Sequence, residues 1–168
     1  MAKILVVDDN PGNRKLVVAL LSQEGHLLIE ANDGADGLEA ARAENPDLVI
    51  SDILMPSMDG FEFVRRLRDD PQLQDVAVIF HTAHYHETEA RNLAAACRVS
   101  RVLVRSTGAA GIVNAVSEVL AGNIDVSAQQ VTLKIACVFV EAVVAQEPDY
   151  LGDRYAVIYQ APFTWLIE

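Results

Sequence analysis

Short apolar runs alternate with segments of helical periodicity along the first 121 residues of the chain. The apolar runs predict five buried strands, at 4–7, 26–30, 48–51, 76–80 and 102–104. Helical spacing predicts helices at 35–43, 87–96 and 109–120, and further helices that follow the loop 10–13 and the pair 59–60. Repeated strand–helix units favour an α/β fold, with a doubly wound five-stranded parallel sheet and right-handed crossovers.

The pattern changes after residue 122. Residues 131–135 alternate like a strand, 138–145 have helical character, and 155–159 and 163–167 resemble short strands. We therefore predict a domain over 1–122 and a C-terminal extension over 123–168. The extension is too short for a well-cored domain and too apolar for a disordered linker. We expect it to pack on the main domain or to contact a partner chain, and self-association into a homodimer is one hypothesis.

Three carboxylates come directly after two of the predicted strands. Asp8 and Asp9 follow the first strand, and Asp52 follows the third. If these strands are neighbours, the three side chains converge at the carboxyl edge of the sheet, where open α/β sheets hold their sites. Three like charges in one place repel unless a cation neutralises them or a proton is retained. Hard oxygen ligands of this kind suit Mg²⁺.

The same edge offers groups for phosphoryl chemistry. Asp52 is the candidate nucleophile, because a carboxylate can accept a phosphoryl group as an acyl phosphate. We expect Asp8, Asp9, Asp52 and the backbone carbonyl near Leu54 to hold the metal. Thr82 ends the fourth strand, where its hydroxyl would donate to a phosphoryl oxygen.

Arg105 lies just after the fifth predicted strand and would supply a countercharge to a phosphoryl group. Three histidines, His81, His84 and His86, suggest a second metal cluster. No cysteine or further histidine supports that interpretation, so we expect His81 to be a packed residue beside an apolar run.

Composition narrows the classes of function. The chain has 168 residues, is 51% hydrophobic and has a formal net charge of -11, which disfavours nucleic-acid binding. The basic residues Arg65, Arg66 and Arg68 are expected to form a solvated helix face. Cys97 and Cys137 show no disulfide or metal spacing, no apolar run is long enough to span a membrane, and no signal peptide is visible. A cytoplasmic protein is expected.

Taken together, the motifs resemble those of response-regulator receiver domains of two-component signalling. The segments that carry the resemblance are 6–11 (Val-Val-Asp-Asp-Asn-Pro), 51–56 (Ser-Asp-Ile-Leu-Met-Pro), 58–60 (Met-Asp-Gly) and 81–83 (His-Thr-Ala). The resemblance covers residues 3–121 and implies a flavodoxin-like fold with strand order 2-1-3-4-5. It implies that Asp52 takes phosphate from a histidine kinase or phosphotransfer protein, that Asp8 and Asp9 place Mg²⁺, and that Thr82 senses the phosphoryl group. The Asp-Asp-Asn-Pro opening resembles receivers linked to hybrid sensor kinases.

Three positions depart from the family pattern. Arg105 and Ser106 stand where a lysine–proline pair is usual, and Val102 stands where an aromatic residue is common. Arginine keeps the charge but has a larger, forked head. These departures affect the usual relay from the phosphoryl group to the face formed by the fourth helix, fifth strand and fifth helix, which an unknown downstream protein would contact.

Two alternatives follow. One is a receiver-like binding module that acts independently of phosphorylation, which the three departures motivate. The other is a small-molecule phosphatase with an aspartate nucleophile. Such enzymes place two aspartates two residues apart on the first strand, and the adjacent pair Asp8–Asp9 lacks that spacing. We therefore expect a phosphorelay switch rather than an enzyme that acts on small molecules.

Overall fold

A computed structural model describes residues 1–82 and 97–122 of the chain. Its strands are β1 (Lys3–Val7), β2 (Leu27–Ala31), β3 (Leu48–Ser51), β4 (Ala77–Thr82) and β5 (Arg101–Val104). Its helices are α1 (Pro11–Gln23), α2 (Gly34–Glu44), α3 (Gly60–Asp69), the short 3-10 helix η1 (Arg105–Thr107) and α5 (Gly108–Leu120).

The strands form one parallel sheet in the order β2-β1-β3-β4-β5. The strand order changes direction at β1, which lies between β2 and β3. Register across the β1–β3 pair places Val7 opposite Ser51, so the residues that follow both strands leave the sheet at the same edge. An open parallel sheet has its crevice where the order reverses in this way. The predicted α/β class and strand order are confirmed.

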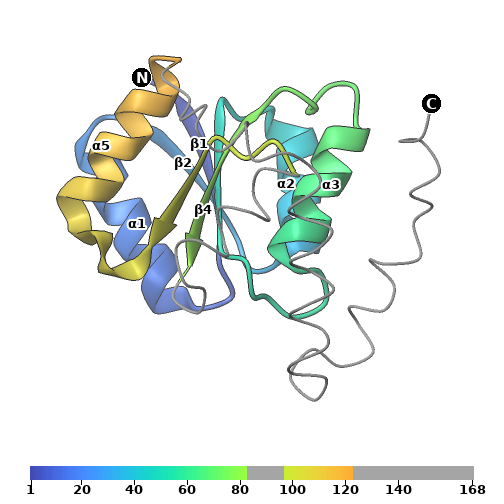
Figure 1. Ribbon diagram of the computed structural model, residues 1–168, viewed down its shortest axis with the longest axis horizontal. Helices are drawn as coiled ribbons and strands as arrows, with labels where there is room; N and C mark the ends of the chain where they lie inside the picture. Colours follow the sequence, from blue (N-terminus) through green and yellow to red (C-terminus); the bar gives the residue numbers. More distant parts are fainter. Residues whose placement is uncertain (83–96, 123–168) are drawn as a thin grey trace, which may run out of the picture. The chain divides into compact units, whose positions relative to one another are not determined.

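Helices cover both faces of the sheet, with α1 and α5 on one side and α2 and α3 on the other (Figure 1). Alternation along β1 supplies both layers: Leu5 and Val7 pack toward α2 and α3, whereas Ile4 and Val6 pack toward α1 and α5. All four side chains are buried, which explains why the strand has a continuous apolar sequence rather than an alternating one.

Polar caps set where the helices begin. The Asn10 side chain accepts hydrogen bonds from the amides of Gly12 and Asn13 at the start of α1, with Pro11 as the first helical residue. Asp33 and Asp59 cap α2 and α3 in the same way. These caps lie in the loops that follow β1, β2 and β3, so they fix the loops that surround the carboxyl edge of the sheet.

Most predicted element boundaries differ from the observed ones by one or two residues. The second strand is shifted to 27–31, and the fourth strand extends to Thr82 because its last two residues continue the pairing with β5. The predictions for the helix at 87–96 and for the extension at 123–168 lie outside the described residues. None of the helices in the described part of the chain is both long and apolar enough to cross a bilayer.

The predicted solvated face of Arg65, Arg66 and Arg68 is confirmed for the first two residues and wrong for the third. Arg65 and Arg66 are exposed and pair with Glu62, as expected for a solvated face. Arg68, however, is half-buried, and its guanidinium donates to the carbonyl oxygens of residues 74, 76, 97 and 98. Burial, followed by the nearby Arg98, lowers the pKa of Arg68. Arg68 leaves the solvated face because these backbone carbonyls, from the segments that lead into β4 and β5, lie within reach of its guanidinium.

Candidate functional site

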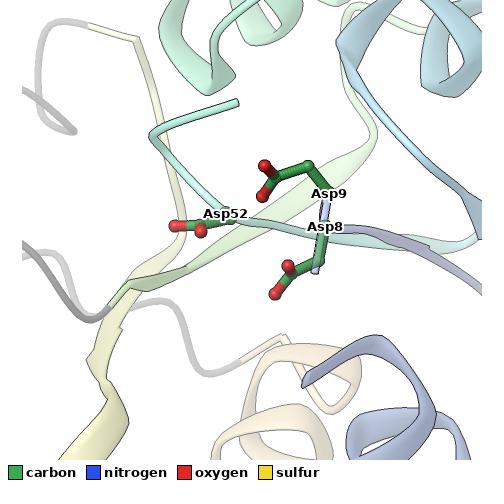
Figure 2. A group of neighbouring side chains, drawn as sticks. All are labelled: Asp8, Asp9 and Asp52. Atoms are coloured by element: carbon green, nitrogen blue, oxygen red, sulfur yellow. The ribbon is translucent and has the colours of Figure 1, made fainter. Parts of the chain in front are cut away.

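The carboxyl ends of β1 and β3 bring Asp8, Asp9 and Asp52 together. One oxygen from each carboxylate lies within 4.8 Å of the others. Figure 2 shows the three side chains next to one another beyond the two strand ends. The Asp52 amide donates to the Val7 carbonyl at 2.9 Å, so sheet pairing continues up to the site itself.

The three carboxylates have different environments. Asp8 and Asp52 are only 3% and 4% exposed, whereas Asp9 is exposed to solvent. Burial of two carboxylates close together is costly unless hydrogen bonds or a cation offset their charge. The pocket thus combines two shielded oxygen donors with one that faces water.

Asp8 is fixed by the loop that follows it. Its Oδ1 accepts a hydrogen bond from the Asn10 amide at 2.8 Å and a longer one from Asn13 Nδ2 at 3.5 Å. The Asp8 backbone carbonyl accepts from Arg14 Nη1 at 2.6 Å. The first turn of α1 therefore holds both the side chain and the main chain of Asp8.

Asp52 sits in a tight turn. Its Oδ1 accepts from the Ile53 amide at 2.7 Å, and its backbone carbonyl accepts from the buried Ser51 hydroxyl at 2.7 Å. Gly60, the first residue of α3, packs directly on this turn, and its amide donates to the Ile53 carbonyl at 2.8 Å. A Cβ atom at Gly60 would lie 2.9 Å from the Ile53 Cα and closer still to the Asp52 carbonyl, so only glycine fits without a shift of the main chain.

The other predicted site residues also lie at this edge of the sheet. Thr82 is the last residue of β4 and is fully buried; register pairs it with Val104, the last residue of β5. Arg105 follows immediately, as the first residue of η1. Leu54 lies in the loop after Asp52.

The two remaining chemical predictions concern histidine and cysteine. His81 is buried within β4, as expected for a packed residue, whereas His84 and His86 lie outside the described residues. Cys97 is remote in sequence from the carboxylates, and burial raises the pKa of its thiol to about 11. A thiol with that pKa is protonated at neutral pH, so the structure supports no nucleophilic role for Cys97.

Sequence reasoning missed the residues that support the pocket. Arg14 and Ser51 hydrogen-bond to backbone carbonyls of Asp8 and Asp52, and backbone targets leave no spacing signal. The one available signal was the place of Arg14 in the first turn of the helix that follows Asp8 and Asp9. In the sequence, Gly60 stands out only as part of the Met-Asp-Gly motif, and the steric need for glycine appears once α3 packs on the turn after β3.

Comparison with known proteins agrees with this arrangement. The family model of the response regulator receiver domain matches residues 4–117. Protein PilH of Pseudomonas aeruginosa is 40% identical over 89 residues, which are 53% of this chain and 74% of PilH. Hybrid signal transduction histidine kinase D of Dictyostelium discoideum is 39% identical over 84 residues, which are 50% of this chain but 5% of that kinase.

A solved structure shows the same fold. The chemotaxis protein CheY4 of Vibrio cholerae matches with a TM-score of 0.66 and 29% identity, over 71% of this chain and 98% of that one. The chain therefore belongs to the response-regulator receiver family, whose members serve as phosphoacceptor switches in two-component signalling.

Proposed function

We propose that Asp52 accepts a phosphoryl group from a histidine kinase or a phosphotransfer protein, and that the reaction depends on Mg²⁺. The observation that carries this proposal is the trio of carboxylates within 4.8 Å at the carboxyl edge of the sheet. Family membership supports the same role.

The donor set fits Mg²⁺. Asp8, Asp9 and Asp52 would hold the ion together with the backbone carbonyl of Leu54. Carboxylate and carbonyl oxygens with access to water are the ligands that this ion takes, and the exposure of Asp9 leaves one side of the group open to water. Bound Mg²⁺ would neutralise charge on the carboxylates and on the phosphoryl oxygens.

The transfer itself needs little covalent chemistry from the protein. An Asp52 oxygen forms a bond to phosphorus while the phosphorus–nitrogen bond of a phosphohistidine breaks. The electron pair of that bond stays on the imidazole nitrogen, which takes up a proton, and Asp52 becomes an acyl phosphate. The hydrogen bond from the Ile53 amide to Asp52 Oδ1 holds the carboxylate orientation before transfer.

Two residues would respond to the new phosphoryl group. The Thr82 hydroxyl would donate to one of its oxygens from the end of β4, and Arg105 would supply the countercharge from the residue after β5. Both strands end at the same edge, and β4 and β5 are paired through Thr82 and Val104. A change at Thr82 would therefore reach β5 and alter the surface that a downstream protein contacts.

Intact-mass spectrometry tests the phosphoacceptor role. The full chain is incubated with Mg²⁺ and a small phosphodonor such as acetyl phosphate or phosphoramidate, with and without EDTA. We expect one phosphoryl group on the wild type, none on Asp52→Asn and none in EDTA. Glu39→Gln, which alters an exposed carboxylate of α2, is the control and should be modified like the wild type. Unchanged modification of Asp52→Asn would contradict the proposal.

A second candidate is a binding module that does not use the phosphoryl signal. The observation in its favour is Val102, which is buried in the cluster on the α2 and α3 side of the sheet, where an aromatic residue is common in the family. Amide chemical shifts of phosphorylated and unmodified protein separate the two candidates. Chemical-shift differences that extend from Thr82 through β5 to α5 support a switch. Differences confined to the loop after Asp52 support a binding module that ignores the phosphoryl group.

The remaining assignments are proposals of the same kind. We propose a cytoplasmic protein with no nucleic-acid ligand, in keeping with the net charge of -11. The boundary between 1–122 and 123–168 and self-association through the extension stay predictions. Light scattering on the full chain measures the oligomeric state directly, and a monomer would rule out the homodimer.

A further inference from the structure

The side chain of Arg14, in α1, reaches back to the main chain that links Asp8 and Asp9. Its Nη1 donates to the Asp8 carbonyl oxygen at 2.6 Å, and its Nε donates to Glu30 Oε2 at 3.0 Å. The Arg14 side chain is only 12% exposed. Since Glu30 belongs to β2, one guanidinium connects the helix, the end of β1 and the neighbouring strand.

The carbonyl that Arg14 contacts belongs to the peptide unit that joins Asp8 to Asp9. A peptide unit is planar, so fixing its carbonyl also fixes the direction in which the chain enters Asp9. The Asp8 carboxylate has supports of its own in Asn10 and Asn13. Among the described residues, none is seen to hydrogen-bond the exposed Asp9 carboxylate, so its position depends on the main chain.

We propose that Arg14, oriented by Glu30, is a positioning residue that sets the place of Asp9 and thereby strengthens Mg²⁺ binding. This inference rests on the metal site of the proposed function. The expected change in Mg²⁺ affinity is opposite to the one that charge alone predicts. By charge alone, removing a cation beside three carboxylates should tighten the binding of Mg²⁺. If Arg14 acts by position, its removal weakens binding instead.

Isothermal titration calorimetry of Mg²⁺ into the full chain tests this difference. We expect Arg14→Gln to weaken Mg²⁺ binding about tenfold, as is typical of residues that orient metal ligands. Arg14→Lys keeps the charge but loses the fork that contacts both partners, so it should also weaken binding. Lys15→Gln removes the same charge from an exposed position on the same helix and should leave the affinity equal to that of the wild type or slightly higher.

A double-mutant cycle with Asp9→Asn tests whether Arg14 acts through Asp9. In the Asp9→Asn background, the loss caused by Arg14→Gln should largely disappear. An equal fold-loss in both backgrounds would overturn the proposal, as would unchanged or tighter binding by the two Arg14 variants. Thermal melts in EDTA report whether each variant is folded. If Arg14→Gln does not fold, the same titrations of Arg14→Lys test the proposal.

The controls also separate failure of this inference from failure of the proposed function. If the wild type binds Mg²⁺ and the Arg14 variants bind it equally well, only the positioning role is refuted. If the wild type itself shows no Mg²⁺ binding, the proposed metal site is refuted and the positioning role with it.

Discussion

Replacing Asp52 with asparagine should stabilise the folded chain when no divalent cation is present. Asp8 and Asp52 are both buried, and their oxygens lie within 4.8 Å. Two unit charges at that separation repel by about 3 kcal/mol at an effective dielectric constant of about 20. The asparagine oxygen still accepts the hydrogen bond that Ile53 donates at 2.7 Å in the wild type. We expect a gain of about 1–3 kcal/mol in the free energy of unfolding, because solvent and neighbouring groups offset part of the repulsion.

Mg²⁺ should reduce or reverse this difference in stability between Asp52→Asn and the wild type. A ligand that binds only the folded state stabilises it, and the gain in free energy rises with the logarithm of the ligand concentration relative to Kd. The wild type offers one more negative charge than Asp52→Asn, so it should bind the ion more tightly. Urea unfolding followed by far-UV circular dichroism, in EDTA and in excess Mg²⁺, measures both free energies. The stability advantage of Asp52→Asn should shrink or change sign when Mg²⁺ replaces EDTA.

Glu39→Gln is the matched control, because it makes the same carboxylate-to-amide change at an exposed position of α2. Its free energy of unfolding should stay within about 0.5 kcal/mol of the wild type in both buffers. A loss of stability in Asp52→Asn in EDTA would refute the reasoning, since it would mean that other contacts of the Asp52 carboxylate outweigh its repulsion by Asp8.

Three further predictions concern the groups around the site and the far end of the sheet. Gly60→Ala should destabilise the domain by about 1–3 kcal/mol and slow phosphorylation, because its Cβ would push the turn at Asp52; urea unfolding and a phosphorylation time course measure both effects. Arg68→Met should lower the free energy of unfolding by about 2–4 kcal/mol, because four backbone carbonyls lose their donor, whereas Arg65→Met should cost less than about 1 kcal/mol. The pKa of the Cys97 thiol is about 11, raised by burial from its ordinary value of 9.0, so the folded state binds that proton more tightly than the unfolded state. Stability from this thiol is complete below pH 9 and is lost as the pH rises to about 11, and the unfolding free energy of Cys97→Ala should fall less over that window.

The fold was largely predictable from the chain itself. Buried parallel strands need apolar side chains on both faces, so β1 and β3 appear as uninterrupted runs, and caps at Asn10, Asp33 and Asp59 mark the helices between them. The exact ends were less predictable. Thr82 belongs to β4 only because it pairs with Val104 of another strand.

The residues of the site could be predicted from the sequence about as well as the fold. Asp8, Asp9 and Asp52 stand at strand ends, and parallel strands that pair in register bring such residues to one edge. The predicted topology was enough to bring the three carboxylates together, but it did not predict how far each of them is buried. Burial of Asp8 and Asp52 but not Asp9 depends on how the loops after β1 and β3 pack, which periodicity does not encode.

By itself, the sequence determined the alternation of strands and helices and the three carboxylates of the pocket, because apolar periodicity and residue type are local properties. Tertiary structure decided which groups support that pocket. Arg14 reaches the Asp8 carbonyl and Glu30, and Arg68 leaves the expected solvent face for backbone carbonyls. The contacts of both arginines depend on carbonyls and carboxylates that are distant along the chain and become neighbours only after the sheet has formed.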